Sequence, residues 1–285
     1  MGHAGTLDPI AEGLLIVLIN KATKFFNYFL TLNKEYIAKI KLGVVTDTWD
    51  LDGKVLAERK VGNISAEEIS GVLEKFTGKI EQKPPVYSSV KYKGKPSYKY
   101  ARKGWNIDLK PRIVNIHDLK LVSLDKDLLT IKINCSSGTY IRSLAHEIGE
   151  KLGCGASIKG LERVKIGNFR LEDGIGVESF LKTGLKKSDL LSNPYVVPLE
   201  RLLESSPVLY IKDEFKSCII NGNRISGEMI MSVKSGESDL LKKGILIKIK
   251  DSNENTVAIH EILNEINISG IKDIKSNLTK SIVIF

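Results

Sequence analysis

A segment near the start of the chain places a carboxylate where it could take part in chemistry. Gly2–Pro9 reads Gly-His-Ala-Gly-Thr-Leu-Asp-Pro, so Asp8 stands between a glycine-rich turn and an apolar run. Proline disfavours the helical conformation for the residue before it, which predicts extended or turn backbone at Asp8. A carboxylate held there is a candidate nucleophile or general base. The alternative is turn formation, which is the commoner use of an Asp-Pro pair in a loop.

A second segment supplies a possible partner for that carboxylate. In Gly138–Leu144, Tyr140 and Arg142 lie two positions apart at a predicted strand end. Side chains two apart on a strand face the same way, which would leave Ile141 to pack inward. An arginine beside Asp8 would hold its carboxylate through a bidentate contact. A structural ion pair elsewhere in the protein is the alternative, and the residue types alone do not decide between the two.

The segment 83–112 carries most of the excess positive charge. It holds nine basic residues and one acidic residue, in a chain whose net charge is +9. Aromatic residues are interleaved with the cations, a pattern that favours nucleic acid because cations neutralise phosphates and rings stack on unpaired bases. A solvated basic loop is the alternative. The basic residues are Lys83, Lys91, Lys93, Lys95, Lys99, Arg102, Lys103, Lys110 and Arg112.

Metal and membrane chemistry are not indicated by the sequence. The four histidines show no paired spacing, and the three cysteines lie far apart without a CxxC pair, so no metal site is expected. Sparse, odd-numbered cysteines favour a cytoplasmic protein with reduced thiols. The longest apolar run, Gly13–Ile19, is too short for a bilayer, which needs about 20 residues.

The elements that must position Asp8 and Arg142 are short strands and helices in no strict strand-helix-strand order. This order predicts an α+β fold with a mixed, mainly antiparallel sheet and flanking helices. The hydrophobic patterns predict strands at Leu14–Leu18, Tyr36–Leu42, Ile113–Ser123 and Leu128–Cys135, the first of them buried, and helices at Ala22–Leu30, Ser65–Phe76 and Ile141–Leu152.

The pattern changes near residue 205. A short helix at Asp213–Ile220 is followed by predicted strands at Ile245–Lys250, Thr256–Ile262 and Ser281–Phe285. About 80 residues of short strands suit a small β-barrel. We therefore expect two domains, residues 1–205 with 83–112 as a basic insertion, and residues 206–285.

Ordered motifs run through residues 1–170 and together resemble one family. Gly2–Pro9 is followed by Lys21–Phe25, Lys34-Glu35-Tyr36, Thr46–Gly53, Pro84–Lys91, Cys135–Leu144 and Leu152–Ala156. In this order and spacing the motifs resemble the bacterial tRNA pseudouridine-55 synthases, the TruB family. The resemblance implies a pseudouridine synthase fold with a C-terminal PUA-like β-barrel that holds the acceptor side of tRNA.

The resemblance also implies roles for individual residues. Asp8 matches the catalytic carboxylate, Arg142 its arginine partner, and Tyr36 the ring on which the target base stacks. The implied substrate-binding residues are His3, which contacts displaced loop nucleotides, Tyr140, Leu161 as an apolar wall under the base, Lys24 and Lys91. The implied reaction converts the T-loop uridine at position 55 of tRNA to pseudouridine after base flipping. It needs no cofactor, and a monomeric enzyme acting on the tRNA T-arm is expected.

The sequence departs from the family pattern at three places. Glu147 replaces the usual Asp, and Leu161-Glu162-Arg163-Val164 differs from the usual Leu-Arg-Arg-Thr. The chain also begins at the catalytic loop, so we expect an encoded upstream segment without which the protein is less stable and less active. The alternative function is therefore a catalytically impaired tRNA-binding folding chaperone. A metal-dependent phosphoesterase is less favoured, because no second carboxylate cluster offers ligands.

Overall fold

The computed structural model describes residues 1–105, 107–183, 193–199, 203, 206–235 and 239–284. The chain forms two compact units, each with its own hydrophobic core. The first unit comprises Gly2–Leu18 and Phe26–Gly174, and the second comprises Met1, Ile19–Phe25 and Ile175–Phe285. The boundary expected at residue 205 lies outside the described residues, as does Phe285 at the end of the last predicted strand.

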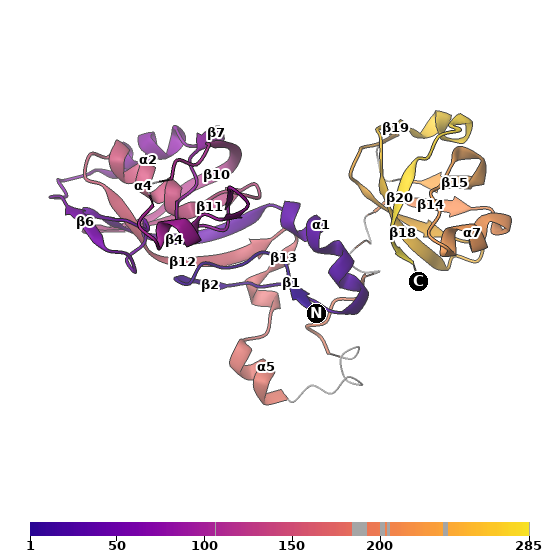
Figure 1. Cartoon of the computed structure of the whole chain (residues 1–285), viewed down its shortest axis with the longest axis horizontal. Helices are drawn as coiled ribbons and strands as arrows, with labels where there is room; N and C mark the ends of the chain where they lie inside the picture. Colours follow the sequence, from indigo (N-terminus) through magenta and orange to yellow (C-terminus); the bar gives the residue numbers. More distant parts are fainter. Residues whose placement is uncertain (106, 184–192, 200–202, 204–205, 236–238, 285) are drawn as a thin grey trace. The chain divides into compact units, whose positions relative to one another are not determined.

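The first unit is built on a seven-stranded sheet (Figure 1). One short strand, β2, runs parallel to its neighbour β12, and the other pairs are antiparallel. The mixed, mainly antiparallel sheet predicted from the sequence is therefore confirmed. The sheet order is β13 (Phe169–Arg170), β12 (Ala156–Ile166), β4 (Lys34–Leu42), β11 (Leu128–Cys135), β10 (Arg112–Asp125) and β7 (Gly78–Gln82), with β2 (Ala11–Gly13) also on β12.

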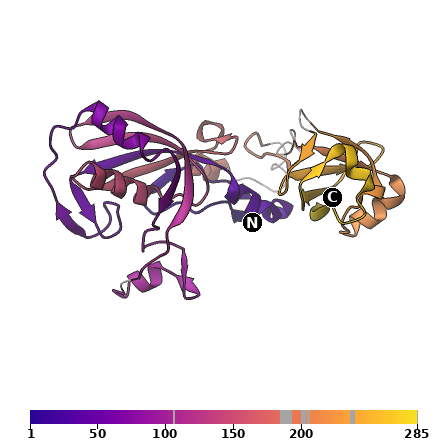
Figure 2. The ribbon, with the colours of Figure 1, turned by 90° about the horizontal axis from the view of Figure 1, so that it is seen from above.

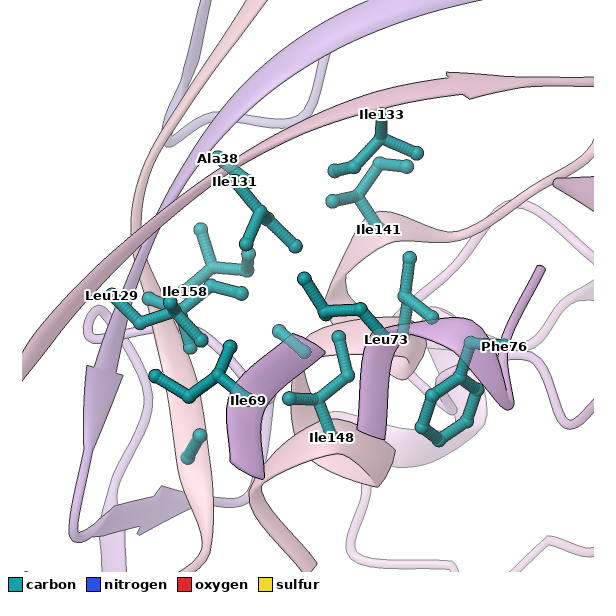
Figure 3. Close-up of a cluster of buried hydrophobic side chains, with 14 of the residues drawn as sticks. Ala38, Ile69, Leu73, Phe76, Leu129, Ile131, Ile133, Ile141, Ile148 and Ile158 are labelled. Atoms are coloured by element: carbon teal, nitrogen blue, oxygen red, sulfur yellow. The ribbon is translucent and has the colours of Figure 1, made fainter. Parts of the chain in front are cut away.

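Both long helices of this unit cover one face of the sheet, where α2 (Ala66–Glu74) and α4 (Ile141–Lys151) pack over the core (Figure 3). Alternate residues of β11 point into this core: Leu129, Ile131 and Ile133 are buried, while their neighbours are half-buried. The helix α2 begins with a capping box, in which Ser65 and Glu68 exchange side-chain and backbone hydrogen bonds. The predicted strands at β4, β10 and β11 and both helices are confirmed.

The buried strand predicted at Leu14–Leu18 is wrong. The run holds only a two-residue strand at its end, β3 (Val17–Leu18), which pairs with β1 (Gly2–His3). The exposed fractions of Leu15 and Val17 are 42% and 51%. The cause is Gly13, whose φ of +100° turns the chain where it lies against β12. A Cβ atom there would lie 2.5 Å from the carbonyl oxygen of Arg163, so only glycine fits.

The helix predicted at Ala22–Leu30 forms in two pieces, the 3₁₀-helix η1 (Asn20–Phe25) and the helix α1 (Phe26–Thr31). The basic insertion contains a hairpin of β8 (Lys91–Tyr92) and β9 (Lys95–Pro96) and the short helix α3 (Tyr98–Ala101). Figure 2 shows this magenta segment extending away from the sheet of its unit.

The second unit contains a five-stranded sheet in the order β15 (Ile230–Lys234), β14 (Val208–Ile211), β17 (Leu246–Lys250), β18 (Thr256–Ile262) and β20 (Thr279–Ile284). A two-stranded ribbon of β16 (Leu240–Leu241) and β19 (Ile266–Asn267) accompanies it. The predicted helix forms as η4 (Asp213–Phe215) and α7 (Lys216–Ile220), and the predicted strands match β17, β18 and β20. No helix in the described part of the chain is long and apolar enough to cross a membrane.

Candidate active site

Asp8 and Arg142 form an ion pair in the first unit. The Nε atom of Arg142 donates a hydrogen bond to Oδ2 of Asp8 at 2.8 Å. The arginine side chain is 5% exposed and the aspartate side chain 37% exposed. The arginine is therefore a fixed, buried anchor, while the carboxylate remains accessible. The contact uses one N–H group, so the bidentate geometry expected from the sequence is wrong.

The other N–H groups of Arg142 have their own acceptors. Nη1 donates to the carbonyl of Thr48 at 3.1 Å and to Oδ2 of Asp50 at 3.3 Å, and Nη2 donates to the carbonyl of Tyr87 at 3.0 Å. Both terminal nitrogens are thus directed at other acceptors, which explains the single contact with Asp8. Arg142 lies in the first turn of α4 rather than at the predicted strand end, and only its N-cap, Tyr140, has extended backbone.

The turn after β5 (Val44–Thr46) supplies two of these acceptors and is itself rigidly held. Asp50 is buried, and its Oδ1 accepts a hydrogen bond from the Thr48 hydroxyl at 2.6 Å. Trp49 has a φ of +62° and stacks on His146 of α4, with ring centroids 4.6 Å apart and planes 8° from parallel. From the sequence, Thr46–Gly53 was identified only as one of the motifs shared with the family, and Asp50 was missed as a partner of Arg142.

Tyr36 lies on β4 directly opposite Arg163 of β12. Its ring is half-buried, and burial raises the pKa of its hydroxyl above the ordinary value. The negative charge of Asp8 contributes to that rise, while Arg163 opposes it. Tyr36 is therefore a neutral phenol near the carboxylate. Leu161 is buried in the same core cluster and pairs with Ala38, two residues farther along β4.

Tyr140 is fixed through its backbone. The amide of Gln82 donates to the Tyr140 carbonyl at 3.0 Å and accepts from the Tyr140 N–H at 2.8 Å. Gln82 is 1% exposed, so this double hydrogen bond is shielded from water. Burial raises the pKa of the Tyr140 hydroxyl, and a hydrogen bond with Ser88 partly opposes that rise. The helix α4 therefore begins from a fixed point beside Arg142.

The remaining predicted site residues lie on other elements. His3 is exposed on β1, opposite Val17 of β3. Lys91 is exposed on β8 of the basic insertion. Lys24 lies in η1, which belongs to the second compact unit. The structure thus brings together Asp8, Arg142, Tyr36, Tyr140 and Leu161 around the sheet and α4.

The basic insertion presents cations, but several of its rings pack on one another. Tyr92 and Tyr100 meet edge to face at 5.4 Å, and Tyr100 lies 5.5 Å from Trp105. Val90, Ile107 and Leu109 form a small core beneath them. All nine basic residues of the segment are exposed, and Lys83 pairs with Asp108. Among the described residues, no group of three or more His, Cys, Asp or Glu side chains could hold a metal ion.

Two family models match the chain. Residues 1–141 match the TruB family pseudouridylate synthase N-terminal domain, and residues 142–204 match the tRNA pseudouridylate synthase B C-terminal domain. A tRNA pseudouridine synthase B from Clostridium tetani is 37% identical over 242 residues, covering 85% of this chain and 81% of the relative. That of Syntrophus aciditrophicus is also 37% identical, covering 92% and 82%. That of Endomicrobium trichonymphae is 48% identical, covering 61% and 76%.

Solved structures share the fold. The crystal structure of a Cbf5-Nop10-Gar1 complex contains a chain that matches with a TM-score of 0.68 at 24% identity, covering 99% of this chain and 76% of that one. The archaeal box H/ACA sRNP Nop10-Cbf5 complex gives a TM-score of 0.67 at 22% identity, covering 99% and 76%. At this identity the likeness concerns the fold alone, and it agrees with the α+β fold class predicted from the sequence.

Proposed function

The chain belongs to the TruB family of pseudouridine synthases, which are isomerases, and we propose that it converts the T-loop uridine at position 55 of tRNA to pseudouridine with Asp8 as its catalytic carboxylate. The observation that carries this proposal is the Asp8–Arg142 pair, in which an accessible carboxylate is held by a buried guanidinium. A buried arginine with four acceptors holds the carboxylate in a constant position.

The proposed reaction balances without a co-reactant. The N1–C1′ bond of uridine breaks, a C5–C1′ bond forms, the hydrogen on C5 leaves as a proton, and N1 gains a proton. Because the atoms of the product are those of the substrate, neither an oxidant nor a group donor is required. Asp8 supplies the nucleophile or base that this rearrangement needs at the nucleoside.

The target base has to leave the T-loop before Asp8 can reach it. A flipped base is held by stacking on aromatic side chains and by apolar walls. Tyr36 supplies the ring, and its raised pKa keeps the hydroxyl neutral at physiological pH. Leu161 supplies the apolar wall, and Tyr140 is the N-cap residue at the start of α4. The flipped uridine would lie between these side chains and Asp8.

The rest of the tRNA requires contacts with phosphates. The exposed lysines and arginines of 83–112, including Lys91, suit the backbone of the T-arm. We assign His3 to the displaced loop nucleotides and Lys24 to a further phosphate. The C-terminal unit, which we regard as PUA-like, would hold the acceptor side of the tRNA.

The test uses a tRNA transcript with tritium at C5 of its uridines. Pseudouridine formation replaces the C5–H bond, so one tritium per tRNA should be released to water. A transcript with cytidine at position 55 is the control and should release none. Tight binding of tRNA without tritium release would contradict the proposal and identify a binding protein instead.

A further inference from the structure

Arg163 is a buried cation whose hydrogen-bond partners are two backbone carbonyls and the hydroxyl of Tyr36. It lies in the middle of β12 and is 2% exposed. Its Nε donates to the carbonyl of Leu14 at 2.8 Å, and its Nη2 donates to the carbonyl of Gly5 at 3.0 Å. Burying a guanidinium in a sheet is costly, and an apolar side chain of similar volume is often at least as stable. Stability of the sheet is therefore a weak explanation for this residue.

The two carbonyls lie on either side of Asp8 in the sequence. The loop between them is closed by backbone hydrogen bonds from Ala4 to Ile16 at 2.9 Å and from Leu14 to Arg163 at 2.7 Å. Gly5 has a φ of +93°, and a Cβ atom there would lie 3.5 Å from Nη1 of Arg163, so its backbone lies close to the guanidinium. One side chain thus binds both ends of the loop that carries the catalytic carboxylate.

The same residue adjoins the stacking ring, because Arg163 and Tyr36 are directly opposite each other in the β12–β4 register. One guanidinium therefore contacts the loop of Asp8 from the strand that lies against Tyr36. This arrangement links the two groups that act on opposite sides of the bound base.

We propose that Arg163 is a positioning residue that fixes the Asp8 loop relative to Tyr36, and so sets the distance between the catalytic carboxylate and the stacked uracil. This inference rests on the proposed function. The residue is not catalytic itself, because its hydrogen-bond partners are protein groups, namely the Leu14 and Gly5 carbonyls and the Tyr36 hydroxyl. Its expected effect is on the rate of the chemical step rather than on tRNA affinity.

The first measurement is single-turnover tritium release at saturating enzyme. Arg163→Met should lower the rate constant about 100-fold, the loss expected when a reacting group moves by about 1 Å. The dissociation constant for tRNA should change little, since the lost interaction acts on the transition state. Arg163→Lys keeps the charge but lacks the separate guanidinium nitrogens that donate to the Leu14 and Gly5 carbonyls, and should give an intermediate rate. If Arg163→Met does not fold, the lysine variant carries the comparison.

The matched control is Arg170→Met. Arg170 lies on the neighbouring strand β13, is exposed and pairs with Glu172, so its loss removes the same charge without touching the loop. Its rate should equal that of the parent. A rate loss equal to that of Arg163→Met would show that net charge, not positioning, is responsible and would overturn the inference.

The second measurement does not depend on activity. Amide hydrogen exchange of Ala4 and Leu14 should become at least about tenfold faster in Arg163→Met, because hydrogen bonds to a charged group are lost. Amides in β11 should keep the exchange rates of the parent. Unchanged exchange in the loop, or a loss of affinity in place of rate, would overturn the inference. Absence of tritium release from the parent would instead refute the proposed function, and the exchange result would still decide the role of Arg163.

Discussion

Arg142 binds Asp8 through Nε alone, at 2.8 Å, and its Nη1 and Nη2 atoms donate to three other acceptors. One guanidinium therefore joins the catalytic loop, the turn that contains Asp50, the base of the basic insertion and the start of α4. Because the three nitrogens of the guanidinium have separate acceptors, a displacement of any one segment shifts the position of the carboxylate. The site is held by a junction of chain segments rather than by an isolated ion pair.

Asp8→Asn should reduce pseudouridine formation to a trace while tRNA affinity stays close to that of the parent. The amide keeps the size and polarity of the side chain but lacks the ionised oxygen that a nucleophile or base requires. Tritium release and filter binding with the same tRNA measure the two effects. Asp52→Asn, an exposed carboxylate in the nearby turn, is the control and should remain active. Turnover by the Asp8 variant above a trace rate would exclude Asp8 as the catalytic carboxylate.

Tyr36→Ala should lower single-turnover activity strongly, because stacking of a base on an aromatic ring is worth about 1–3 kcal/mol. That free energy corresponds to roughly a 5- to 150-fold loss. Tyr36→Phe keeps the ring and separates the contribution of the hydroxyl. Equal rates for the Ala variant and the parent would refute the stacking role.

The sequence predicts those parts of the fold that depend on local pattern. The alternation in β11 and the capping box of α2 can be recognised in the sequence because each depends on neighbouring residues. The strand β12 could not be predicted in this way, because its glycine, its charged residues and the fully buried Arg163 disrupt the apolar alternation. The apolar run after Gly13 does not form the predicted buried strand, because contact with β12 imposes a turn there.

The candidate site divides in the same way. Asp8 and Arg142 could be paired only through the family resemblance, since 134 positions separate them. Asp50 was missed because its role depends on a contact with Arg142 across 92 positions, which no local pattern encodes. Its only local signal is the polar turn Thr46–Gly53, which is equally typical of an ordinary turn.

Neutralising Lys91, Lys93 and Lys95 together to Gln should weaken tRNA binding without changing the single-turnover rate at saturation. Each phosphate contact that is lost should reduce the slope of log affinity against log salt by about 0.7 to 0.9. Titrations at several salt concentrations measure that slope. The control replaces three exposed lysines of the same unit outside the insertion: Lys54, Lys60 and Lys75. Equal slopes for the two triple variants would mean that the insertion does not bind the backbone.

His260 should make the C-terminal unit sensitive to acid. Its side chain is fully buried, its Nδ1 lies 2.7 Å from the Thr279 hydroxyl, and burial lowers its pKa from 6.5 to about 4. Above pH 6.5 the ring is neutral in both the folded and unfolded states. As the pH falls from 6.5 to 4, the unfolded chain binds a proton that the folded unit does not. The free energy of unfolding should therefore fall through this window, by about 3 kcal/mol in total.

His260→Gln removes that titration while keeping a polar partner for Thr279. Denaturant unfolding at pH 7, 5.5 and 4, followed by amide exchange in β18, measures the dependence. The His260 contribution is the difference in slope between the parent and the variant. Identical pH dependence of unfolding in the two proteins would contradict the predicted contribution of His260.

Trp49 holds a left-handed backbone conformation at the corner that aims Thr48 and Asp50 toward Arg142. A non-glycine residue in that region costs about 1–2 kcal/mol, and stacking on His146 offsets part of this cost. Trp49→Ala loses the stack but keeps the backbone cost, whereas Trp49→Gly loses both. The glycine variant should therefore be more stable than the alanine variant by about 1 kcal/mol, as measured by thermal unfolding. Both should turn over more slowly than the parent, because without the stacked ring the turn is less firmly held. If the alanine variant were as active as the parent, the hydrogen bonds of Arg142 would suffice to position the turn without Trp49.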